Sequence, residues 1–234
     1  MTMLTSVQHF CRRVNIPVPV TVYGSTDTQI LQVMALLEEE GNDLSLRGDW
    51  QGITFEATHT TIAAEDQGAI STIASNGFRY VKNNTLWDRN SKLPVFVLDA
   101  TEWQAVKAVA ISGPRYQARI RGGKLLANPT PTAGLTWAFE YVSKNWILNG
   151  ATYKQYFTAD ADTVLLPEDL VMMGLRWRWK KEKGLDYAED FRTYEMQVTK
   201  ALSQDGLKRN LNMGEYSTGP SPGIIVPMGT WAVP

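Results

Sequence analysis

The chain has 234 residues, of which 44% are hydrophobic, so it is long enough to bury a real core in one large or two small domains, and a disordered protein is excluded. Its 23 basic and 24 acidic residues exclude a global positive field for nucleic acid, so any contact with DNA has to be local. The apolar runs are too short to span a bilayer, and we expect a protein used in a cytosol-like compartment.

The first predicted element is a helix over residues 4–14. Leu4, Val7 and Phe10 recur at helical spacing, and the stop signal NIPVPV follows. Cys11 is the single cysteine of the chain, so neither an intramolecular disulfide nor a cysteine metal cluster can form. Its place on the apolar side of this helix favours a small buried side chain over a reactive thiol.

A second helix is predicted to follow and to end near residues 47–48. Apolar residues repeat at helical intervals from Ile30 to Leu44, and the residues at 25–27, Ser-Thr-Asp, can cap the first amides. The pattern also allows a break at Gly41.

Strand signals begin after Trp50 and continue to about residue 144. The sequence ITFEATHTTI alternates apolar and polar residues and is rich in β-branched side chains. Turn motifs SNG, KNN and RGGK separate the extended segments, and FRYV with TLWD and YQARI with KLLA are predicted hairpins. Residues 101–110 have helical spacing, whereas LTWAFEYVSKNWI is predicted to be a strand that leads into a surface loop.

Two helices are predicted near the C-terminal end. The first covers residues 166–184, with Pro167 in its first turn and Gly184 at its end. The second covers residues 186–204, and the very short turn between them predicts an antiparallel hairpin. The predicted fold class is therefore α+β, with a helical bundle formed by the N- and C-terminal helices, an inserted antiparallel β-rich domain and an extended C-terminal arm. The predicted boundaries are 1–49 for the N-terminal helices, 50–160 for the insertion, 161–205 for the C-terminal hairpin and 206–234 for the arm.

The sequence predicts no catalytic residue, no metal site and no cofactor. Neither His9 nor His59 has a neighbouring carboxylate and nucleophile. Residues 160–170 lack the third ligand, the central glycine and the spaced glutamate of a calcium-binding loop. The RGGK motif lacks the spacing and the following helix of a phosphate loop, so it is interpreted as a hairpin turn.

One segment, RWRWKKEK, concentrates basic and aromatic residues. Interleaved cations and aromatic rings can bind a nucleic-acid backbone. The favoured alternative is that the tryptophans pack inward or against a neighbouring subunit while the cations face acids of the next helix, Asp186, Glu189, Asp190 and Glu195. The candidate residues for a subunit interface or a DNA-facing surface are Arg176, Arg178, Lys180, Lys181 and Lys183.

The final stretch, STGPSPGIIVPMGTWAVP, combines linker residues with apolar ones. Such an arm can fold back on its own core, be a disordered remnant, or add a strand to a sheet edge of a partner. We favour docking on a partner, because the prolines stiffen the free arm and reduce the entropy lost on binding.

This order of elements resembles the head-to-tail adaptor proteins of short-tailed bacteriophages, the family that includes tail tubular protein A. The resemblance rests on the helix STDTQILQVMALLEEEGNDLSLRGDW, on FRYVKNNTLWDR and on the helix pair that begins at PEDL. It covers residues 26–202 and rests on order rather than on a catalytic motif.

The resemblance implies a non-enzymatic structural protein of the virion neck, assembled in the host cytoplasm and without a membrane partner. It implies a ring, expected to be a dodecamer, between the phage portal protein and the tail nozzle protein. The ring would line the channel through which genomic DNA leaves and would touch that DNA non-specifically. The arm would bind the portal through Ile224, Ile225, Val226, Pro227, Met228 and Trp231.

Overall fold

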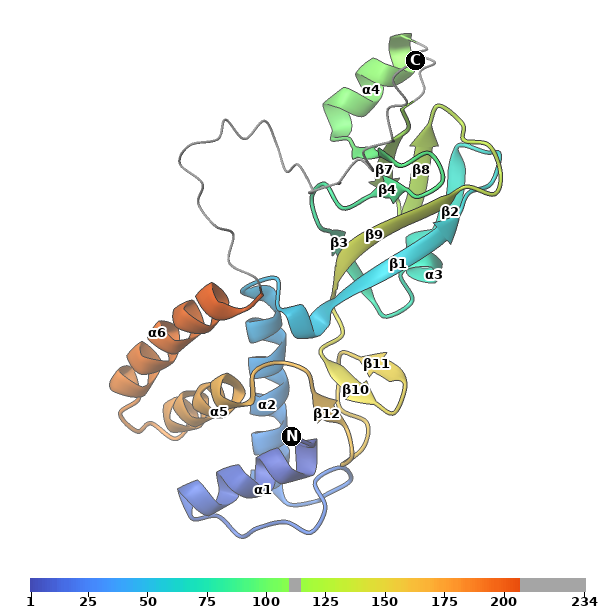
Figure 1. Cartoon of the computed structure of the whole chain (residues 1–234). Coiled ribbons are helices and arrows are strands. Elements are labelled where there is room, and N and C mark those ends of the chain that lie inside the picture. Colours follow the sequence, from blue (N-terminus) through green and yellow to red (C-terminus); the bar gives the residue numbers. More distant parts are fainter. Residues whose placement is uncertain (110–114, 207–234) are drawn as a thin grey trace, which may run out of the picture.

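The computed structural model describes residues 1–109 and 115–206, and Figure 1 shows α1, α2, α5 and α6 gathered in one part of the molecule and most strands in another. This mixed α+β structure agrees with the predicted fold class. The helices are α1 (Met3–Val14), α2 (Thr28–Leu46), the short 3-10 turn η1 (Gln51–Ile53), α3 (Ile70–Ile73), α4 (Ala100–Val109), α5 (Glu168–Glu182) and α6 (Ala188–Gln204). The strands are β1 (Thr54–Thr60), β2 (Asp66–Ala69), β3 (Phe78–Val81), β4 (Trp87–Asp88), β5 (Leu93–Pro94), β6 (Phe96–Val97), β7 (Gln117–Arg121), β8 (Lys124–Asn128), β9 (Thr136–Ser143), β10 (Ile147–Asn149), β11 (Thr152–Lys154) and β12 (Thr163–Val164).

Helix α2 begins at a polar cap, as the sequence predicts, and continues without the break that Gly41 allowed. The Asp27 carboxylate accepts a hydrogen bond from the amide of Gln29 at 2.8 Å, which satisfies one of the free amides of the first turn. At Gly41 the indole of Trp146 lies so close to the helix that a Cβ atom would collide with it. Gly41 therefore leaves space for the Trp146 ring against the helix and does not end the helix.

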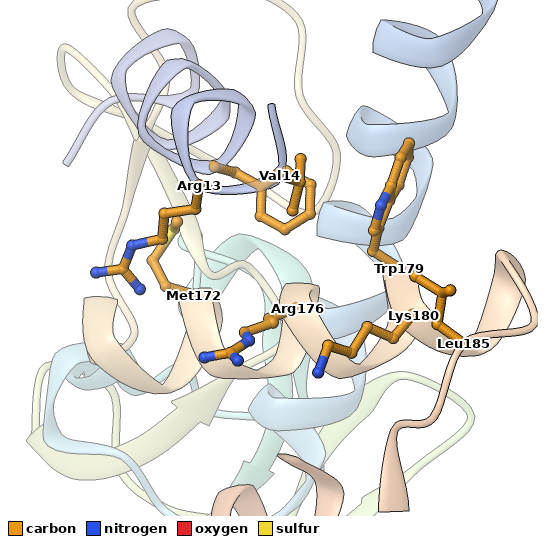
Figure 2. Close-up of a pocket in the computed structure, with 8 residues that line it drawn as sticks. Arg13, Val14, Met172, Arg176, Trp179, Lys180 and Leu185 are labelled. Carbon is orange, nitrogen blue, oxygen red and sulfur yellow. The ribbon is translucent and has the colours of Figure 1, made fainter. Parts of the chain in front are cut away.

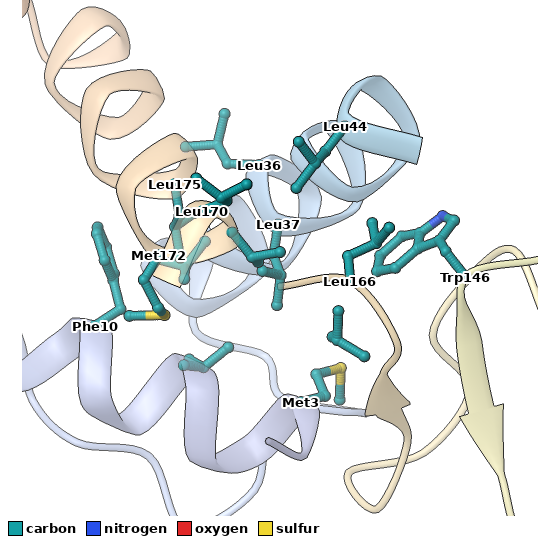
Figure 3. Packing of buried hydrophobic residues seen from close by; sticks show 14 of the residues in the cluster. Met3, Phe10, Leu36, Leu37, Leu44, Trp146, Leu166, Leu170, Met172 and Leu175 are labelled. Atoms are coloured by element: carbon teal, nitrogen blue, oxygen red, sulfur yellow. The ribbon is translucent and has the colours of Figure 1, made fainter. Parts of the chain in front are cut away.

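The four long helices of the first part enclose one apolar core, and Figure 3 shows part of it, with residues of α1, α2 and α5. Cys11 is buried in it, as predicted, and burial raises the pKa of its thiol. Several large side chains of this core are inaccessible to solvent or nearly so: Met3, Phe10, Leu37, Leu44, Trp146 and Leu175. Full burial of one such side chain stabilises the fold by about 1.5–3 kcal/mol, so this cluster holds the helices together.

The strands form three sheets, with the orders β1-β9-β4-β5, β2-β8-β7-β6 and β11-β10-β12, and β3 also pairs with β9. The predicted hairpin of YQARI with KLLA is confirmed as β7 and β8, and Gly122 and Gly123 supply positive φ angles of 58° and 72° in its turn. The predicted hairpin of FRYV with TLWD is wrong. Strands β3 and β4 lie one after the other along β9, at Tyr80↔Val142 and Trp87↔Ala138, so they do not pair with each other.

The β region is not wholly antiparallel, which corrects the predicted insertion. Strand β6 pairs with β7 in parallel. The intervening helix α4, which the spacing of residues 101–110 predicted, carries the chain back across the sheet, as a parallel connection requires.

Strand β9 belongs to both apolar cores of the described protein. Trp137, Phe139 and Tyr141 point to one face and lie in the core of the β region, whereas Val142 points to the other face and lies in the helical core. The inserted segment runs from Thr54 to Val142, within the predicted bounds of 50–160, and it begins and ends at neighbouring residues because Thr54 at the start of β1 is paired with Val142.

Candidate functional site: the basic helix and the groove beside it

Helix α5 carries the basic and aromatic residues, and its two tryptophans pack inward, as the favoured interpretation predicts. Trp177 is buried, and its ring centroid lies 5.0 Å from that of Phe191 on α6. Trp179 is also buried and meets Phe10 of α1 edge-on at 5.7 Å. These rings hold α6 and α1 on α5, so neither is free to stack on a nucleic-acid base.

Arg178 reaches towards α2. Its Nε donates to the Glu40 carboxylate at 2.8 Å, its Nη2 donates to Asp43 at 2.9 Å, and its Nη1 contacts Glu39. Its guanidinium also lies over the ring of Trp177, 4.6 Å from the centroid. Only 7% of Arg178 is exposed. The prediction that this residue faces DNA or a neighbouring subunit is therefore wrong.

Glu40 is the centre of this network and is fully buried. The hydroxyl of Tyr194 on α6 donates to its Oε1 at 2.6 Å. Burial raises the pKa of Glu40, while the hydrogen bonds from Arg178 and Tyr194 act in the opposite direction. Burial and the neighbouring Glu40 charge also raise the pKa of Tyr194, which keeps the phenol protonated as a donor. The network joins α2, α5 and α6 around one carboxylate.

The remaining basic residues of α5 are partly neutralised. Arg176 lies 3.3 Å from Asp190 of α6, and Lys180 contacts the same carboxylate, so one of the four proposed acids is paired in the predicted way. The ammonium groups of Lys181 and Lys183 lie 6.0 and 4.4 Å from the ring centroids of the two tryptophans of the same helix. The sequence therefore overstates how much free positive charge this helix presents.

A groove of about 470 Å³ lies between α1 and α5 (Figure 2). Its lining residues are Phe10, Arg13, Val14, Met172, Arg176, Trp179, Lys180 and Leu185. Figure 2 shows the charged ends of Arg13, Arg176 and Lys180 on one side of the groove, and no acidic side chain lines it. An anionic group attached to an apolar one fits this arrangement of an apolar floor and a cationic rim.

The described residues offer no arrangement for binding a metal ion. Within residues 1–109 and 115–206, no cluster of histidine, cysteine or carboxylate side chains could hold a metal ion. His59 lies 3.4 Å from the Gln67 side chain. Asp162 is buried and accepts hydrogen bonds from the amides of Thr158 and Ala159 at 2.6 and 3.0 Å, so its carboxylate shapes a loop.

Two parts of the site were not predicted from the sequence. Arg13 belongs to α1, and only the packing of α1 on α5 brings it to the groove. The acidic run at Glu38, Glu39 and Glu40 follows directly on the apolar residues Met34–Leu37 of α2, and this charge in a core-facing segment is the signal that could have indicated a buried basic partner.

The predicted portal-binding residues, Ile224, Ile225, Val226, Pro227, Met228 and Trp231, lie outside the described residues. None of the helices in the described part of the chain combines the length and apolar character that crossing a membrane requires. Comparisons of this chain with protein-family models and with curated proteins find no match.

Proposed function

We propose that the protein is a head-to-tail adaptor of a short-tailed bacteriophage. In this proposal it is a structural virion protein that forms a ring between the portal and the tail nozzle and lines the DNA exit channel. The order of packed elements carries the proposal: α1 and α2 share a core with α5 and α6, and a β-rich segment lies between them in the chain. This order supports the helical bundle with an inserted β-rich domain that the resemblance implies.

Contacts between the two ends of the described chain support the bundle. The rings of Phe10 and Trp179 join α1 to α5. Arg47 at the end of α2 donates to Glu195 of α6 at 2.6 Å. Segments separated by the whole β region therefore stabilise each other, and the bundle can present the insertion and the arm as two separate attachments.

The arm supports the proposal through its composition. Residues 217–234 contain no charged side chain, and Ile224, Ile225 and Val226 are consecutive β-branched residues. An extended apolar segment of this kind binds by adding a strand to a sheet edge and by placing alternate side chains in pockets. Repetition around a ring multiplies weak single contacts, because each bound arm raises the effective concentration of the next.

The groove supplies a candidate contact inside the ring. Arg13, Arg176 and Lys180 would meet an acidic surface of the neighbouring subunit or the backbone of the passing DNA. Substitution of all three by glutamine would leave both ring assembly and DNA passage unchanged if neither contact exists.

The test is native mass spectrometry of the protein mixed with the portal of the same phage. The test variant replaces Ile224, Ile225, Val226 and Trp231 by serine. The matched control replaces Thr218, Ser221 and Thr230 by alanine in the same arm. We expect the wild-type chain and the control to saturate the portal ring, and we expect the test variant to lose the complex.

Equal binding of the test variant and the wild-type chain would remove the arm from the proposal. Absence of binding by the wild-type chain would reject the adaptor function itself. The second candidate function is then a nucleic-acid-binding module, favoured by the cationic rim of the groove and weakened by the burial of Arg178. It predicts DNA binding by the isolated protein that weakens steeply as salt rises.

A further inference from the structure

The loop between α1 and α2 exposes large apolar side chains. Val18, Val20 and Tyr23 of this loop are 44%, 89% and 50% exposed. Val22, between them, is fully buried and anchors the loop on the helical core. Single apolar residues on a surface are ordinary, but three within six residues form a patch of the kind that binds another protein.

Hydrogen bonds from two other segments hold this loop in place. The Asp160 carboxylate accepts hydrogen bonds from the amides of Val22 and Tyr23 at 3.0 and 2.7 Å. The Gln8 side chain of α1 donates to the carbonyl of Pro19 at 3.0 Å, and the proline ring restricts the φ angle at that point. A surface that is ordered before binding loses little conformational entropy when a partner binds.

Negative charge accompanies the exposed apolar side chains. Burial opposes the charged form of Asp160, but hydrogen bonds from Tyr23, Thr21 and Val22 prevail and lower the pKa of its carboxyl group. Asp27, at the end of the loop, is exposed. Neither carboxylate forms an ion pair within residues 1–109 and 115–206. We call this surface the loop patch, and its residues are Val18, Val20, Tyr23, Asp27 and Asp160.

The groove between α1 and α5 carries the opposite charge (Figure 2). Arg176 and Lys180 share one carboxylate, that of Asp190, and Arg13 forms no ion pair within the described part of the chain. Leu185, at the end of the groove, is 55% exposed. A DNA backbone would meet the cations but not the apolar floor, whereas an apolar centre with a polar rim is typical of protein–protein interfaces.

We propose that the loop patch of one copy of this chain binds in the α1–α5 groove of a second copy. Val20 and Tyr23 would cover the apolar floor, and Asp27 and Asp160 would lie near the cationic rim. Because the two surfaces differ, each copy can bind one neighbour through its groove and another through its loop, and such a contact builds a ring when its rotation closes. This inference rests on the proposed ring and names the contact that would form it.

The test is sedimentation velocity of the full chain without the portal. The groove variant is Arg13→Gln with Arg176→Gln and Lys180→Gln, and the loop variant is Val20→Ser with Tyr23→Ser. We expect the wild-type chain to form oligomers and each variant alone to associate at least about tenfold more weakly. An equimolar mixture of the two variants is expected to form a dimer and nothing larger, because it contains a single type of intact groove–loop pair. A dimer in the mixture also shows that both variants are folded.

Two matched controls remove exposed side chains elsewhere and are expected to assemble like the wild-type chain. One is Arg121→Gln with Arg192→Gln and Lys200→Gln, and the other is Ile62→Ser with Met196→Ser.

A wild-type chain that stays monomeric would overturn the proposal, and so would either variant assembling as the wild type does. A mixture that stays monomeric, or controls that lose assembly, would overturn it as well. Portal binding is measured separately with variants of the arm, so failure of this contact and failure of the adaptor function are distinguishable.

Discussion

Substitution of Arg178 by methionine is expected to destabilise the protein by about 3–5 kcal/mol, the usual cost when one partner of a buried ion pair is removed. Glu40 has no exposed surface, and its carboxylate would keep only the hydroxyl of Tyr194. The partners Glu39 and Asp43 are more exposed and would be solvated by water, so most of the loss comes from Glu40.

Urea unfolding followed by circular dichroism measures this loss. The matched control is Arg192→Met, because Arg192 forms an exposed pair with Glu189 on α6 and its loss is expected to change the free energy of unfolding little. The double variant Glu40→Met with Arg178→Met removes both buried charges and is expected to recover most of the stability. A loss of less than about 1 kcal/mol for Arg178→Met would refute the argument that Glu40 depends on this arginine.

Two further predictions concern close contacts in the described core and loops. Gly174→Ala places a methyl group against the Glu40 carboxylate and is expected to cost about 1–3 kcal/mol of stability by overpacking. The control Ser203→Ala, on the exposed side of α6, should change the melting temperature little. Equal melting temperatures of the two variants would contradict the tight approach of α5 and α2. Burial opposes the charged form of Asp162, but the hydrogen bonds from Thr158, Asn149 and Ala159 prevail and lower the pKa of the carboxyl group. Asp162→Asn should therefore lower the free energy of unfolding by about 1.5–3 kcal/mol at pH values above the unfolded pKa of about 3.9. This loss should shrink as the pH falls through the folded pKa. An equal loss at pH 7 and pH 3 in urea unfolding would contradict the lowered pKa of Asp162.

The helices were predictable because their signals are local. Asp27 caps α2, and the positive φ of Gly184 follows the end of α5, as the sequence indicated. The partners of β3 and β4 were not predictable, because turn residues between two short strands do not reveal that a long aromatic strand, β9, is the better partner for both. Long-range pairing overrode local turn chemistry there.

The candidate site was predictable only in part for the same reason. The inward packing of Trp177 and the pairing of Lys180 with Asp190 follow from a basic, aromatic helix next to an acidic one. The direction of Arg178 depends on α2, which lies far away in the chain, and helical periodicity contains no information about that neighbour. The same holds for Arg13, which reaches the groove through tertiary packing alone.

The pairing of Thr54 with Val142 has a consequence for how the chain is assembled and how it could be divided. The two ends of the insertion are adjacent in space, so for the helical part the insertion is equivalent to a short turn. Replacing the insertion by a tight hairpin would therefore cost the helical part little loop-closure entropy. During folding the reverse holds. The helices α5 and α6 are far from α2 in the sequence until the pairing of β1 with β9 brings the ends of the insertion together. We therefore expect formation of this strand pair to limit the rate at which the helical core forms.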